Sequence, residues 1–137
     1  MSDHQHTFSR DRLVQKFGEQ PFSLVFSGQG FNWLKTLREA VAAGAGFNVN
    51  SIVERAASLT EPVADELTAA RPFGFDPVDW ASNDDDPAFD ISQAVLSVPG
   101  IFVSQLATLD TLEAQRLSLE KSAVTIGHSQ GALGVHL

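Results

Sequence analysis

The sequence "TIGHSQGALGVHL" at residues 125–137 contains the most informative pattern in the chain. The apolar run "SAVTI" at 122–126 predicts a short strand, and the pentapeptide "GHSQG" at 127–131 follows it directly. Glycines two residues to either side of a serine permit a tight turn from a strand into a helix, because they remove side chains that would collide there. Such a turn points the serine hydroxyl outward. The sequence therefore predicts a strand, a nucleophile elbow and a helix, with Ser129 as the nucleophile.

A second glycine turn follows an earlier predicted strand. The compact apolar run "PFSLVF" at 21–26 leads into "SGQG" at 27–30. A Gly-Gln-Gly turn exposes the backbone N–H of Gln29. The helix expected after Ser129 has free N–H groups at its start, among them that of Gln130, and its dipole favours negative charge. We therefore expect the N–H groups of Gln29 and Gln130 to form an oxyanion hole.

Helical patterns occupy most of the chain between and before the two predicted strands. We expect helices at 8–17, at 31–44, through 51–70 with an interruption at Pro62, and from Pro99 onward. The stretch "RPFGFDPVDWASNDDDP" at 71–87 is expected to be irregular, with Asp84–Asp86 in a solvated loop rather than a cation site. Strands joined by long helical crossovers predict an α/β fold with a parallel sheet.

Composition restricts the classes of function. The 137 residues carry 9 Lys and Arg against 17 Asp and Glu, a net charge of −8, and this acidity argues against a nucleic-acid partner. With no cysteine, disulfides and zinc–thiolate sites are excluded. His4 and His6 are expected in a disordered tail, so we expect no metal or bound cofactor. Neither a secretory signal nor an apolar run of about 20 residues is evident, which predicts a cytoplasmic protein without a membrane partner.

The pair "VFSGQG" and "GHSQGALG" resembles the acyl-carrier-protein acyltransferase family. Within that family the chain is most similar to the N-terminal acyltransferase of bacterial and fungal type I fatty acid synthases. An added N-terminal segment, a long gap between the two motifs and the piece "ISQAVLSVPGIFVSQLATLD" carry this narrower resemblance. It implies a tail and short helix at 1–20. Residues 21–137 would then be the N-terminal portion of an acyltransferase domain, an incomplete parallel-sheet core that ends soon after the nucleophile.

The resemblance implies transfer of an acetyl or malonyl group from acyl-CoA to the phosphopantetheine of an acyl carrier protein, in fatty acid synthesis. Ser129 would carry the acyl group as an ester. The family's general-base histidine, and its arginine for a malonyl carboxylate, lie downstream of the serine and outside this chain. His128 and His136 are not expected to replace that base, so we expect the chain alone to be inactive. The implied partners are the remainder of the synthase chain and the carrier protein, in a large homo-oligomer.

Three alternatives stay open at the level of sequence. An α/β-hydrolase such as an esterase shares the elbow but needs no Gly-Gln-Gly turn. A polyketide synthase acyltransferase often has Glu where this chain has Ala132. A non-enzymatic fragment would agree with the missing base. The sequence does not distinguish acetyl from malonyl as the donor group, and it does not give the oligomeric state.

Overall fold

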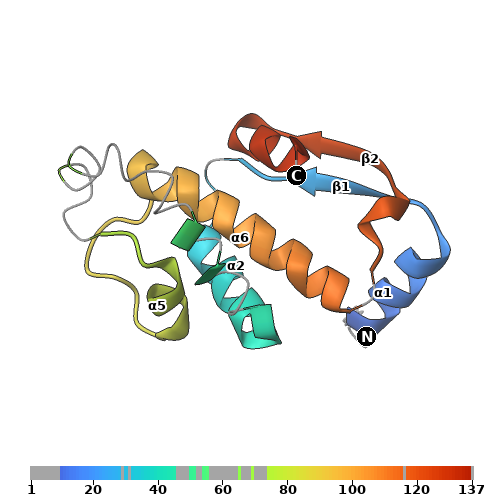
Figure 1. Cartoon of the computed structure of the whole chain (residues 1–137), viewed down its shortest axis with the longest axis horizontal. Coiled ribbons are helices and arrows are strands. Elements are labelled where there is room, and N and C mark those ends of the chain that lie inside the picture. Colours follow the sequence, from blue (N-terminus) through green and yellow to red (C-terminus); the bar gives the residue numbers. More distant parts are fainter. Residues whose placement is uncertain are drawn as a thin grey trace, which may run out of the picture.

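The structure is a computed structural model that describes residues 10–28, 30, 32–45, 50–51, 54–55, 65, 69, 74–115 and 117–136. It is a mixed α/β arrangement in which a small parallel sheet lies along one side of packed helices (Figure 1). In chain order the elements of the described part are α1 (Arg10–Glu19), β1 (Phe22–Phe26), α2 (Trp33–Ala40), η1 (Val41–Ala45), α5 (Pro77–Ser82), α6 (Ala94–Ala114), η3 (Leu119–Lys121), β2 (Ser122–Gly127) and η4 (Ser129–His136).

The sheet consists of β1 and β2, which pair in parallel. Their register places Leu24 opposite Thr125 and Phe26 opposite Gly127, so both strands end at the same level. This confirms the predicted strands at 22–26 and 122–126 and their parallel pairing. The consequence for function is geometric, because the glycine turns that follow the two strands both begin at the carboxyl edge of one sheet.

The core lies between α2 and α6. Trp33, Leu34 and Leu37 on α2 are almost completely buried, as are Ile101 and Ala107 on α6. The helix expected at 31–44 is therefore confirmed over 33–40, and its apolar residues form part of the core. That helical segment ends through η1, where Gly44 adopts a φ of 101°, a left-handed conformation that commonly ends helices. Figure 1 shows α6 crossing the middle of the molecule, with α2 on one side and the sheet on the other.

Gly100 allows α6 to approach α2 closely. An ideal Cβ atom on Gly100 would lie 2.5 Å from Cδ2 and from Cε2 of Trp33, so the indole packs directly on the backbone of α6. The indole Nε1 also donates a hydrogen bond of 3.1 Å to the Ile91 carbonyl oxygen. The ring is thus fixed on one side by backbone contact and at its edge by a hydrogen bond.

The expectation of an irregular stretch at 71–87 is wrong in its middle, where α5 forms. The Asp76 side chain accepts a hydrogen bond of 3.1 Å from the backbone N–H of Asp79, and Pro77 occupies the first turn. Both features favour a helix start. Trp80 then packs edge-on against Phe75 and Phe89, with ring centroids 5.7 and 5.1 Å away. A local cap and an aromatic cluster therefore stabilise a helix that the density of prolines seemed to exclude.

The helix expected from Pro99 begins five residues earlier, at Ala94, so that Pro99 lies inside α6. Proline within a helix removes one backbone hydrogen bond and costs about 3 kcal/mol. Burial of Leu96 and Ser97 in the preceding turn accompanies this disruption, and Gly100 and Ile101 are buried immediately after it. Tertiary packing therefore outweighs the local preference for a break.

Helix α6 also corrects the expectation that no long apolar run exists. It has 21 residues, and an 18-residue window with a mean hydropathy of 1.4 meets the length and composition of a membrane span. Half of that window is buried inside the structure, and core helices of soluble proteins meet the same criteria.

One face of the sheet carries exposed apolar side chains. Val25, Val124 and Ile126 have exposed fractions of 69%, 50% and 52%, and Val25 pairs with Ile126 across the two strands. Parallel sheets in proteins are normally covered on both faces. The described part of the chain therefore leaves an apolar sheet face uncovered.

Candidate active site

Ser129 lies where the sequence places it, at the turn between β2 and the helix that follows. It is the first residue of η4 and is separated from β2 by His128 alone. Its φ is +54°, and no other non-glycine residue in the described ranges has a positive φ. This left-handed conformation costs about 1–2 kcal/mol for a residue with a Cβ atom. Such strain persists only where the surrounding structure enforces it, and it concentrates at functional sites.

The glycines flanking Ser129 are required by close backbone approach. A Cβ atom on Gly131 would overlap the Phe26 carbonyl oxygen and lie 2.8 Å from that of Ser27. A Cβ atom on Gly127 would overlap the Gly131 carbonyl oxygen. Because all of these obstacles are backbone atoms, no side-chain rotation could relieve the collisions. The "GHSQG" pentapeptide therefore folds against the end of β1 in a turn that only glycine permits at both positions.

The glycine turn after β1 lies directly against Ser129. An ideal Cβ atom on Gly28 would be 2.6 Å from the His128 carbonyl oxygen and 2.9 Å from Ser129 Cβ. The two motifs, about 100 residues apart in the sequence, are therefore in contact at the carboxyl edge of the sheet. Gln29 itself lies outside the described residues, so its N–H as an oxyanion donor stays a prediction.

Backbone hydrogen bonds hold the turn that contains Ser129. The His128 N–H donates to the Phe26 carbonyl oxygen at 3.2 Å, and the Gly131 N–H donates to the His128 carbonyl oxygen at 2.9 Å. Gln130 is the second residue of η4, so its N–H is among those that have no partner within the helix. The neighbouring N–H of Gly131 is already paired, and Gln130 as the second oxyanion donor stays a prediction.

No described residue is placed as a base for Ser129. Its hydroxyl forms no hydrogen bond with the described part of the chain, and the His128 imidazole lies toward the other turn, with Nδ1 3.4 Å from an ideal Gly28 Cβ. His136 ends η4, which is a 3₁₀ helix rather than the expected α-helix. At about 2.0 Å per residue, seven residues span about 14 Å, further than the roughly 10 Å of an α-helix. The distance argues more strongly against His136 than the sequence alone did.

Gln105 belongs to the surroundings of the site, and the sequence analysis missed it. Its Nε2 atom donates a hydrogen bond of 2.8 Å to the carbonyl oxygen of Ser27, which joins β1 to the glycine turn. Gln105 lies on α6 and is only 8% exposed. The available signal was a glutamine in the middle of a strongly apolar helix, but its partner is 78 residues away and cannot be read from local pattern.

An apolar pocket lies between β1 and the helices α2 and α6, and it does not reach Ser129. It has a volume of about 190 Å³ and is lined by Leu24, Val25, Phe26, Ser27, Thr36, Ser104, Gln105, Thr108, Leu109 and Leu112. Neither Ser129 nor His128 belongs to the lining. We therefore do not assign this pocket to the substrate.

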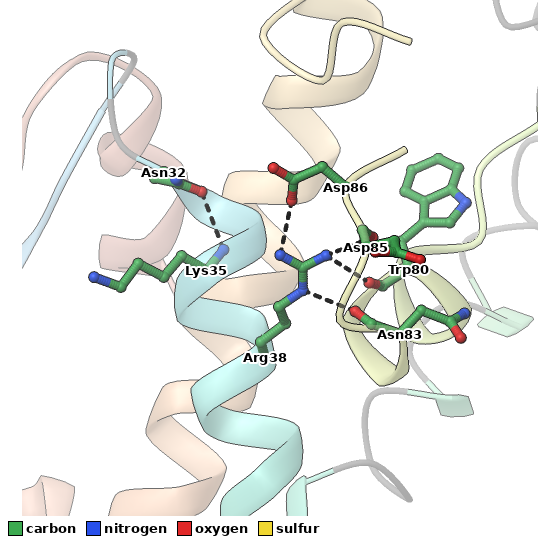
Figure 2. Close-up of polar contacts among 7 residues, drawn as sticks. All are labelled: Asn32, Lys35, Arg38, Trp80, Asn83, Asp85 and Asp86. Atoms are coloured by element: carbon green, nitrogen blue, oxygen red, sulfur yellow. Dashed lines mark hydrogen bonds and ion pairs between the residues drawn. The ribbon is translucent and has the colours of Figure 1, made fainter. Parts of the chain in front are cut away.

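The acidic loop is held by Arg38 of α2 (Figure 2). The guanidinium donates at 3.1 Å to the Asn83 carbonyl oxygen, at 2.8 Å to that of Asp85, and more weakly at 3.5 Å to that of Trp80. It also forms a 2.8 Å ion pair with Asp86. The carboxylates of this loop remain exposed, and no group of three metal-ligating side chains occurs within the described ranges. The loop is therefore attached to the core mainly through its backbone.

No family model, curated protein or solved structure matches this chain. Any functional assignment therefore depends on the two motifs and on the geometry that brings them together.

Proposed function

We propose that residues 21–137 form the N-terminal portion of a serine acyltransferase domain that transfers an acetyl or malonyl group from CoA to a carrier-protein thiol, as in the type I fatty acid synthases that the motifs resemble. Ser129 is the nucleophile, at a nucleophile elbow between β2 and η4. The domain belongs to a longer synthase chain that assembles as a large homo-oligomer in the cytoplasm.

The contact of Gly28 with His128 and Ser129 is the observation that supports this proposal best. An acyl-transfer site needs a nucleophile and an oxyanion hole within about 3 Å of one reacting carbonyl. The contact between the two glycine motifs at the carboxyl edge of a parallel sheet is the arrangement that this proposal requires, and α/β proteins usually bind ligands at that edge. The positive φ of Ser129 adds support, since a strained nucleophile is a feature of elbows.

The reaction proceeds in two balanced steps. The Ser129 hydroxyl oxygen attacks the thioester carbonyl, its proton passes to a general base, and the resulting oxyanion accepts hydrogen bonds from the N–H groups of Gln29 and Gln130. Collapse of this intermediate forms an acyl-serine ester and releases CoA as the protonated thiol. The phosphopantetheine thiol of the carrier then attacks the ester, and the Ser129 hydroxyl is regenerated.

The general base comes from outside residues 21–137 in this proposal. A serine hydroxyl is a weak nucleophile without a base at hydrogen-bond distance. Neither His128 nor His136 is placed to act, as the geometry of the turn and of η4 indicates. The described residues leave the apolar sheet face at Val25, Val124 and Ile126 exposed, as expected if another segment packs against it.

The test measures where the acyl group goes. The full polypeptide that contains these residues is incubated with radiolabelled acetyl-CoA or malonyl-CoA and a phosphopantetheinylated carrier protein, and the label on carrier and in free acid is followed. We expect Ser129-dependent labelling of the carrier, and none in a Ser129→Ala variant. Release of free acid at the same rate with and without carrier would instead indicate an esterase, and no Ser129-dependent turnover would refute the proposal.

A further inference from the structure

The burial of Gln105 is not explained by a gain in the stability of the fold. It lies in the apolar helix α6 at 8% exposure, and among the described residues only its Nε2 atom has a partner. The Oε1 atom is buried and forms no hydrogen bond with any described residue. A buried amide that is half satisfied is less favourable than an apolar side chain of the same shape, because the unpaired oxygen has lost its hydration. The hydrogen bond from Gln105 Nε2 to the Ser27 carbonyl oxygen is therefore a candidate for a role in the active site rather than in stability.

The carbonyl group that Gln105 holds lies at the junction of the two turns. The Ser27 oxygen accepts the 2.8 Å hydrogen bond from Nε2. The same oxygen would lie 2.8 Å from a Cβ atom on Gly131, so it is packed between α6 and the start of η4. The next residue, Gly28, contacts His128 and Ser129. The Ser27–Gly28 peptide group thus contacts α6 through its carbonyl oxygen, and its second residue, Gly28, contacts Ser129.

Peptide geometry transmits this contact to the glycine turn. The Ser27 carbonyl and the Gly28 N–H belong to one planar group, and in a trans peptide the two point in opposite directions. A hydrogen bond that fixes the carbonyl toward α6 therefore also fixes the N–H away from α6. Rotation of this peptide would change the direction of the chain at Gly28 and of the N–H groups that follow it.

We propose that Gln105 is a positioning residue: through the Ser27 carbonyl it sets the orientation of the Ser27–Gly28 peptide, and hence the direction in which the chain enters the segment proposed to hold the oxyanion donor. This inference rests on the proposed acyl transfer. In this proposal α6 has two roles: it packs on α2 in the core, and through Gln105 it also orients the segment after β1.

The test uses Gln105→Met, which keeps a side chain of similar length and removes the donor. Thr111→Val is the matched control, because Thr111 is equally buried on α6 and its hydroxyl donates only to the Ala107 carbonyl of the same helix. In the full polypeptide we expect Gln105→Met to lower kcat for acyl loading by about 10-fold to 10³-fold, the range for loss of an oxyanion donor, with KM for acyl-CoA little changed. Urea midpoints of both variants should stay close to that of the parent.

A second measurement separates this inference from the proposed function. In the 137-residue chain, the NMR resonances of the Ser27 carbonyl carbon and of the Gly28 amide should shift in Gln105→Met and stay in place in Thr111→Val. Loading that is absent in the parent refutes the acyl transfer and the role of Gln105 in it, whatever the resonances do. A parent that loads normally, with kcat retained in Gln105→Met or lost equally in Thr111→Val, overturns the positioning role alone.

Discussion

Replacement of Gly100 by alanine tests the contact on which the α2–α6 core depends. Alanine should stabilise a helix by about 0.8–1.0 kcal/mol relative to glycine. Here the new Cβ atom would lie 2.5 Å from two ring carbons of Trp33, far inside van der Waals contact. Overpacking of a core costs about 1–3 kcal/mol, and displacement of the indole also endangers its hydrogen bond to Ile91, worth about 1 kcal/mol. The net effect should be a loss of about 1–3 kcal/mol.

Urea unfolding followed by tryptophan fluorescence measures this change. With a slope of about 1–3 kcal/mol/M for a small protein, the midpoint should fall by roughly 1 M. Gly18→Ala is the matched control, because Gly18 lies in helix α1 and an added Cβ atom meets nothing within 4 Å. That variant should gain about 0.5–1 kcal/mol. If Gly100→Ala raised the midpoint as Gly18→Ala does, Trp33 would not pack on the backbone of α6 as described.

Two further predictions concern the strained serine and the acidic loop. Ser129→Gly should stabilise the chain by about 1 kcal/mol, since glycine adopts a φ of +54° without a Cβ penalty, whereas Ser129→Ala should not; equal urea midpoints for the two variants would contradict the strain. Arg38→Lys should lower the free energy of unfolding by about 1–2 kcal/mol, because lysine cannot replace a guanidinium fork that donates to several backbone carbonyls. Asp86→Asn should cost less than about 1 kcal/mol, because that carboxylate is 81% exposed, and a larger loss than for Arg38→Lys would show that the ion pair rather than the backbone contacts holds the loop.

The strands and the serine turn could be predicted from sequence because their signals are local. The runs at 22–26 and 122–126 are apolar and are followed within two residues by glycine, and Gly127 is required by the close approach of the Gly131 backbone within the same pentapeptide. Gly44 likewise ends its helix by a conformation that glycine adopts freely. In each of these places a short stretch of sequence contains the physical cause of the structure.

The sequence-based predictions are wrong or incomplete where a contact between distant residues overrides a local preference. Pro99 favours a helix start, yet α6 extends back to Ala94 because the preceding turn is buried in the core. Helix α5 had a local signal in Asp76 and Pro77, but the surrounding prolines and aspartates obscured it. Gln105 depends on the Ser27 carbonyl, and no pattern within α6 predicts that partner. The helices expected at 51–70 lie largely outside the described residues; residues 51, 54, 55, 65 and 69 of that stretch are helical.

Covalent loading of Ser129 tests the proposed nucleophile most directly. The full polypeptide is mixed with stoichiometric acyl-CoA, quenched in acid and digested, and the peptide that contains Ser129 is analysed by mass spectrometry. We predict one acyl group on Ser129, none in Ser129→Ala, and near-normal loading in His136→Ala. The 137-residue chain alone should load several orders of magnitude more slowly, because none of its described residues is placed as a base. Acyl-serine formed by the short chain at the full rate, or an acyl group on any other residue, would contradict the proposed site.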